Sequence, residues 1–271
     1  MAQPPFRAEH VGSLLRPQNL LDARAELEGD QYEEVRDSRS FEQLKAIEDA
    51  AIVDAIRLQE EAGLQVITDG EFRRRSWYQD FVLALDGTAI RFGDSILGFK
   101  DEQGKTLPSH LVVVEGKLSR PAGISTEAFK FVRDHTDRVP KVTMPAPSML
   151  HFLGGRPSID KNAYPDLDAF WDDLVGIYRA EIADLSALGC TYVQLDDVTF
   201  ALICDPKFQA AVRERGEDPD ALVRTYSEAI NRIVSDKPAG MTIGLHTCRG
   251  NNRGMWMAEG GYAFVAETVL K

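Results

Sequence analysis

The stretch Glu60-Glu61-Ala62-Gly63-Leu64-Gln65-Val66-Ile67-Thr68-Asp69 shows the pattern that decides the fold. A helical segment ends at a glycine, and a short apolar run then leads to a polar residue. The same pattern recurs where 187–189 precedes 192–196 and where 238–240 precedes 243–246. Glycine fits the left-handed position that closes a helix. Helices that alternate with strands in this way predict a parallel β-sheet.

Six segments are candidate strands of one α/β barrel. No linker rich in proline, glycine or serine divides the 271 residues, so we expect a single domain over residues 1–271. Four glycines between residues 87 and 104 indicate a surface hairpin or excursion there rather than a barrel strand. The predicted strands are Glu9–Ser13, Gln65–Asp69, Leu111–Glu115, Lys141–Pro145, Thr191–Asp196 and Thr242–Thr247.

The composition is that of a soluble globular protein, with 44% hydrophobic and 27% charged residues. A net charge of −12 disfavours nucleic acid and anionic membranes as partners. Three widely spaced cysteines do not make a disulfide framework, so we expect a reducing, cytoplasmic setting. The first residues lack the apolar core of a signal peptide, and no apolar stretch approaches the roughly 20 residues of a membrane span.

Strand parity places the polar residues that end these strands. Side chains alternate along a strand, so His246 and Cys248 point to the same face. Helices cover the outside of a parallel barrel, so this face and that of Asp196 should point inward. Asp69 and Glu71 share a face if their strand extends that far. Barrel enzymes place their active sites at this carboxyl end of the strands.

Two kinds of chemistry could arise there. An imidazole and a thiolate on one face form half of a zinc site, whereas the alternative is a buried thiol beside a hydrogen-bonded histidine. The carboxylates of Asp69, Glu71 and Asp196 could hold an ammonium group or act as a general base. The alternative for such acids is helix capping. Asp197 is the better capping candidate, because parity turns it away from Asp196.

Two other segments are weaker candidates. The Gly12-Ser13 turn could offer backbone N–H groups to a carboxylate, although an ordinary turn explains it equally simply. His151 and Phe152 could line a planar ligand, but the residues alone favour a place in the core.

Taken together, these segments resemble the C-terminal catalytic barrel of cobalamin-independent methionine synthase, and more closely its stand-alone, single-barrel relatives. The matching motifs occur in the order of the family and span nearly the whole chain. They are His10-Val11-Gly12-Ser13, Thr68-Asp69-Gly70-Glu71-Phe72, Gln194-Leu195-Asp196 and His246-Thr247-Cys248.

The resemblance implies a (β/α)8 barrel of the TIM type in which zinc binds the thiol of homocysteine and a methyltetrahydrofolate donates the methyl group. It implies that His246 and Cys248 are zinc ligands. Glu71 and Asp196 would hold the amino group of the amino-acid thiol, and Ser13 its carboxylate. Phe152 falls near a family tryptophan that packs on the pterin.

The family sequence continues past Lys271 with two more βα units, which supply a glutamate and a second cysteine to zinc and a histidine proposed as the acid. The resemblance therefore predicts a barrel truncated after about six units, with its acid outside this chain. Cys190 and Cys204 do not match the missing cysteine.

Other functions remain open at this point. The chain could be an inactive barrel fragment that assembles through its open sheet edge into a homo-oligomer. It could use another thiol and another alkyl donor. A metal-free barrel of the uroporphyrinogen decarboxylase type is disfavoured, because the chain is acidic and lacks an arginine-rich N-terminal cluster.

Overall fold

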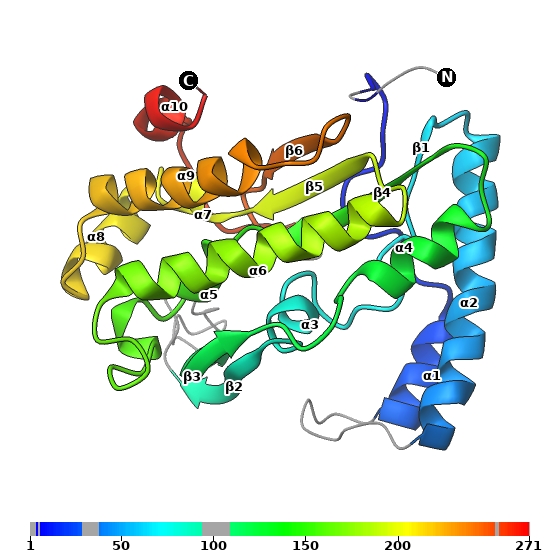
Figure 1. The fold of residues 1–271 in the computed structure, drawn as a ribbon, viewed down its shortest axis with the longest axis horizontal. Helices are drawn as coiled ribbons and strands as arrows, with labels where there is room; N and C mark the ends of the chain where they lie inside the picture. Colours follow the sequence, from blue (N-terminus) through cyan, green and yellow to red (C-terminus); the bar gives the residue numbers. More distant parts are fainter. Residues whose placement is uncertain (1–3, 5, 29–37, 94–108, 253–254, 271) are drawn as a thin grey trace.

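A computed structural model describes residues 4, 6–28, 38–93, 109–252 and 255–270. Its centre is a parallel four-stranded sheet in the order β1 (Val66–Ile67), β4 (Val139–Pro145), β5 (Tyr192–Asp197) and β6 (Thr242–Thr247) (Figure 1). The predicted α/β fold with a parallel sheet is therefore confirmed. In the described part of the chain β1 and β6 are the outer strands of this sheet, and closure into a barrel is not seen.

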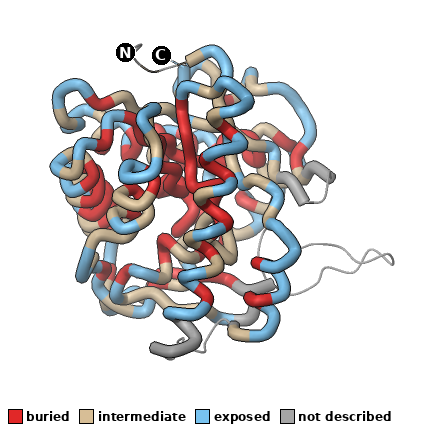
Figure 2. The backbone as a smooth tube through the Cα atoms, turned by 90° about the vertical axis from the view of Figure 1, so that its right-hand side faces the viewer, coloured by how far each residue is buried: buried red, intermediate tan, exposed pale blue. Residues whose placement is uncertain are grey.

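Helices follow one another around one side of this sheet, with α6 in front of it in Figure 1. Val193 and Leu195 of β5 are fully buried and belong to the same core as the apolar faces of α6 and α9. Figure 2 shows the same arrangement as a buried interior enclosed by exposed turns of the surrounding chain. The helices are α1 (Gln18–Glu28), α2 (Ser38–Glu61), α3 (Gln79–Val82), α4 (Thr126–Arg133), α5 (Met149–Phe152), the 3₁₀ helix η1 (Arg156–Ser158), α6 (Leu167–Ala187), α7 (Thr199–Leu202), α8 (Pro206–Glu214), α9 (Pro219–Ser235) and α10 (Ala263–Val269).

Two of the six predicted barrel strands are wrong. Leu111–Glu115 lies in β3 (Ser109–Ser119), which pairs antiparallel with β2 (Asp86–Gly93) in a separate two-stranded sheet. Its run of valines correctly predicts a strand but carries no information about the partner. The surface hairpin or excursion predicted for residues 87–104 overlaps β2 at its start, and residues 94–108 lie outside the described residues.

The segment Glu9–Ser13 is not a strand. Gly12 has a φ of +80°, which interrupts an extended backbone, and the segment is held instead by a lysine from β4. A second short antiparallel pair, β7 (Asn251–Asn252) and β8 (Met255–Trp256), follows β6. No described helix is both long and apolar enough to cross a membrane.

Asp197 has a structural role rather than a place in the site of Asp196, as parity predicts. Its side chain is fully buried and accepts hydrogen bonds from Ser148 Oγ (2.5 Å), from Thr199 Oγ1 (2.8 Å) and from the backbone N–H of Phe200 (2.8 Å). These bonds tie the end of β5 to the start of α7 and to the residue before α5.

We expect Asp197→Ala to lower the free energy of unfolding by about 2–3 kcal/mol, because it leaves three buried donors without an acceptor. Urea denaturation monitored by circular dichroism would measure this. Asp184→Ala is the control, because that carboxylate pairs with Arg120 but its side chain is 51% exposed. Equal effects of the two substitutions would contradict the assignment of Asp197.

Candidate active site

A cavity of about 490 Å³ opens at the carboxyl ends of the parallel strands. It brings together five residues that the sequence singled out from four distant segments. The register explains part of this, because Asp196 of β5 lies directly beside His246 of β6. The lining residues are Val11, Gly12, Ser13, Glu71, Trp77, Asp196, Val198, His246, Cys248 and Gly250.

Glu71 enters this cavity from an unusual backbone conformation. Its φ is +59°, the one positive value of a non-glycine residue in the described ranges, and it directly follows Gly70 at +64°. Such a conformation costs about 1–3 kcal/mol and needs support from its surroundings. Asp69 Oδ1 accepts the N–H of Glu71 at 2.8 Å, and Arg16 donates to the carbonyl of Glu71 at 2.9 Å.

The carboxylate of Glu71 is buried and fixed on both sides. Ser13 Oγ donates to its Oε2 at 2.8 Å, and Thr143 Oγ1 donates to its Oε1 at 3.0 Å. Arg74 Nη1 lies 3.5 Å from Oε1. The hydroxyl of Ser13 thus donates its hydrogen bond to Glu71. Ser13 therefore positions this carboxylate and also lines the cavity.

Asp196 is the second buried carboxylate of the site. Its pKa is raised to about 6, mainly by burial and also by the nearby charge of Glu71, although a hydrogen bond from Gln194 at 2.5 Å acts in the opposite direction. A bound cation stabilises a carboxylate whose ionised form is disfavoured by burial and by a neighbouring carboxylate. An amino group of a substrate is a cation of suitable size.

His246 and Cys248 lie on the outer strand and just beyond it, and both are partly buried. Burial lowers the pKa of the His246 imidazole, and the charge of Lys141 lowers it further. The ring is therefore neutral near pH 7 and keeps a lone pair for a metal or a proton. Within the described residues no group of three or more histidine, cysteine or acidic side chains could hold a metal. The pair fits zinc in the kind of donor but supplies two of four tetrahedral ligands.

Phe152 does not line this cavity. It is fully buried and packs edge-on against Tyr226, with ring centroids 6.3 Å apart. Its neighbour His151 is also buried, with Nδ1 2.8 Å from the hydroxyl of Tyr226. The aromatic wall of the cavity is Trp77, which sequence reasoning missed. Its position in the loop that follows Asp69 and Glu71 is the sequence feature that could have indicated this role.

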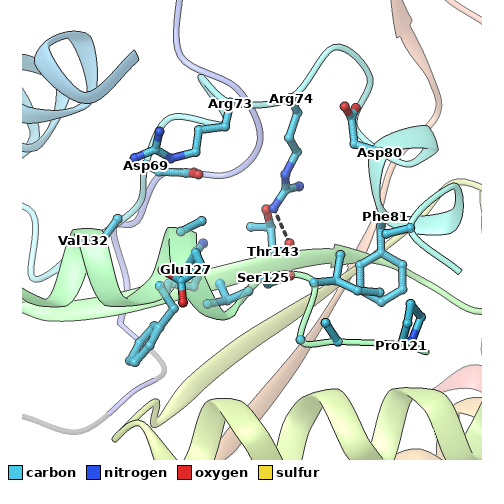
Figure 3. Close-up of a pocket in the computed structure, with 18 residues that line it drawn as sticks. Asp69, Arg73, Arg74, Asp80, Phe81, Pro121, Ser125, Glu127, Val132 and Thr143 are labelled. Carbon is cyan, nitrogen blue, oxygen red and sulfur yellow. Dashed lines mark hydrogen bonds between the residues drawn. The ribbon is translucent and has the colours of Figure 1, made fainter. Parts of the chain in front are cut away.

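A second cavity of about 370 Å³ lies between β4, α4 and the segments around residues 69–84 and 121–125 (Figure 3). None of His246, Cys248 and Asp196 lines it. In Figure 3 the side chain of Arg74 reaches across it, and its Nη2 donates to the carbonyl of Thr143 at 2.5 Å. Arg74 therefore touches both this cavity and the carboxylate of Glu71 in the first.

Known proteins resemble this chain over most of its length. It is 37% identical to the uncharacterized protein YxjH of Bacillus subtilis over 98% of this chain and 67% of that protein. It is 28% identical to a methionine synthase of Pyrococcus abyssi over 76% of this chain and 52% of that protein.

A solved structure named as a vitamin-B12-independent methionine synthase of Listeria monocytogenes is also similar. It matches with a TM-score of 0.70 and 32% identity, over 92% of this chain and 67% of that one. The family model for the catalytic domain of cobalamin-independent synthase matches residues 21–252. The chain therefore belongs to the cobalamin-independent methionine synthase family and carries its catalytic domain.

Proposed function

We propose that this chain is a zinc-dependent methyltransferase that moves a methyl group from a methyltetrahydrofolate-type donor to the thiol of homocysteine or a similar amino-acid thiol. The observation that carries the proposal is the meeting of His246 and Cys248 with Glu71 and Asp196 in one cavity. The first pair matches a thiol-binding metal, and the second pair matches an ammonium group. Membership of the family supports a methyltransferase of this kind.

The metal would be held by the imidazole of His246 and the thiolate of Cys248, together with ligands outside the described residues. Bound zinc supplies a deprotonated and oriented sulfur nucleophile at neutral pH. The neutral state of His246 suits this role, because a protonated ring has no lone pair to donate.

The residues of the chain bind and orient the thiol substrate. Glu71 and Asp196 receive its ammonium group, and the Gly12-Ser13 turn lies where a substrate carboxylate can meet backbone N–H groups. Trp77 provides a flat apolar wall that excludes water and can contact the methyl donor. Holding both substrates in this cavity lowers the barrier to transfer by orientation.

A related transfer with another alkyl donor is the second candidate. It is favoured by the position of Phe152, because the residue expected to stack on a pterin is fully buried. Supplying the enzyme with homocysteine and either a methyltetrahydrofolate or a small S-methyl donor would separate the two. Product formed from the S-methyl donor alone would favour the second candidate.

Zinc affinity tests the proposed metal pair. We expect Cys248→Ala and His246→Ala each to lower the affinity of the reconstituted protein for zinc by at least about tenfold, because each removes one ligand. Competition with a chromogenic chelator measures this. Cys204→Ala is the matched control, because its thiol donates to the carbonyl of Phe200 and does not line the cavity. An unchanged zinc affinity in both ligand variants would refute the metal assignment.

Ligand affinity tests the ammonium site. We expect Glu71→Gln to weaken the binding of L-homocysteine by about 10- to 100-fold, the value of one charge-assisted hydrogen bond. Binding of 4-sulfanylbutanoate, the same thiol without the amino group, should change little. Isothermal titration calorimetry with the zinc-loaded protein gives both constants. An equal loss of affinity for the two thiols would show that Glu71 does not act on the amino group.

The raised pKa of Asp196 predicts a pH-dependent gain of stability on its removal. Between about pH 4 and 6 the folded protein binds more protons at Asp196 than the unfolded chain, so stability falls as pH rises through this window. Asp196→Asn should therefore raise the free energy of unfolding by about 1–3 kcal/mol at pH 7.5 and by progressively less toward pH 4.5. Urea denaturation at both pH values checks this, and a gain independent of pH would contradict it.

A further inference from the structure

Lys141 is a buried cation that the proposed binding and transfer steps do not use. It lies on β4, its side chain has 0% exposure, and it does not line the cavity that holds His246 and Cys248. Its Nζ contacts three acceptors: the carbonyl of His10 at 2.6 Å, Gln194 Oε1 at 2.9 Å and Glu9 Oε2 at 3.3 Å. An ammonium group has three N–H donors, so all three are engaged.

The contact with Gln194 fixes the direction of that amide. An ammonium group can only donate, so the oxygen of the Gln194 amide must face Lys141. The amide NH₂ must then face the other way, toward Asp196, where Nε2 donates to Oδ1 at 2.5 Å. Without Lys141 the amide could turn over and present its oxygen to a carboxylate. Lys141 therefore orients the amide so that its NH₂ group, and not its oxygen, faces Asp196.

The contact with His10 acts on the other side of the cavity. The segment 9–13 forms no strand, and side-chain bonds help to hold it in place beside the backbone bond from the N–H of Leu14 to the carbonyl of Gly70 at 3.2 Å. Lys141 holds the carbonyl of His10, and Tyr192 donates to Glu9 Oε1 at 2.9 Å. Three residues beyond His10, Ser13 donates to Glu71 at 2.8 Å. One buried ammonium group thus begins two chains of contacts, and these end on the two carboxylates of the cavity.

We propose that Lys141 is a positioning residue that orients Asp196 through Gln194 and Glu71 through the His10–Ser13 segment, and so shapes the subsite for the amino group of the thiol substrate. This inference rests on the proposed function for the identity of the ligand. The arrangement of the side chains can be tested without it.

The experiment compares Lys141→Met and Gln194→Met with the unmodified protein, all loaded with zinc. We expect Lys141→Met to weaken the binding of L-homocysteine by about tenfold or more, and Gln194→Met to reproduce part of this loss. Both variants should bind 4-sulfanylbutanoate within about twofold of the unmodified protein. A purely structural role would weaken both thiols equally and would overturn the proposal. Gln194→Met keeps the test decisive if Lys141→Met does not fold.

Glu9→Gln is the matched control, because it removes the ion pair with Lys141 but keeps the bonds from Lys141 to Gln194 and His10, and its amide oxygen can still accept from Tyr192. It should bind L-homocysteine within about threefold of the unmodified protein. If the unmodified protein binds neither thiol, the proposed function fails, and crystal structures of the two methionine variants then decide the inference. Unchanged contacts from Gln194 to Asp196 and from Ser13 to Glu71 in Lys141→Met would overturn it. Loss of either contact would support it.

Discussion

The left-handed backbone at Glu71 is the constraint on which the site depends. An extended residue there would continue the direction of β1, whereas the positive φ values of Gly70 and Glu71 turn the chain sharply at the end of the strand. The turn is held by the carboxylate of Asp69 and by Arg16, which donates to the carbonyls of both Glu71 and Arg74. The same turn carries the following loop back to the cavity, where Trp77 forms part of the wall. Strain of this kind persists where the surrounding contacts over-determine it.

Buried charge is the second determinant of the site. Burial and the charge of Glu71 disfavour the ionised form of Asp196, whereas the charges of Arg74 and Lys141 favour it. Arg74 Nη1 also lies 3.5 Å from Glu71 Oε1. Asp196 therefore remains a buried carboxylate with a raised pKa, and a cation bound in the cavity would favour its ionised form. Natural active sites retain such unfavourable groups because the ligand relieves them on binding. The neighbouring Asp197 has the opposite character, because its acceptors are saturated by the protein itself.

Local sequence signals predicted the parts of this structure that local interactions determine. The strands near residues 141–145, 191–196 and 242–247 were predicted nearly to the residue, because a helix-ending glycine or an apolar run marks each of them. Parity then correctly placed His246 and Cys248 on the cavity and Asp197 away from it. The contacts between segments distant in the sequence were not predictable in this way. The valines of 111–114 signal a strand but not its antiparallel neighbour, and nothing near Glu9 indicates a lysine 132 residues away. Only the tertiary packing shows that Trp77 lines the cavity whereas Phe152 lies in the core.

The cavity has a buried side and a more exposed side. Every residue of β5 is buried, whereas β6 is an outer strand whose residues are half-buried or exposed. The carboxylates of Glu71 and Asp196 therefore lie deep, while His246 and Cys248 lie on the more open side. In the proposed function an amino-acid thiol enters with its ammonium group first and leaves its sulfur at the open side beside the two metal donors. A methyl donor then needs to approach only the sulfur. On this proposal the buried carboxylates would select the thiol substrate, whereas the more open side would leave room for donors of different shape. The cavity would then determine the thiol more narrowly than the donor.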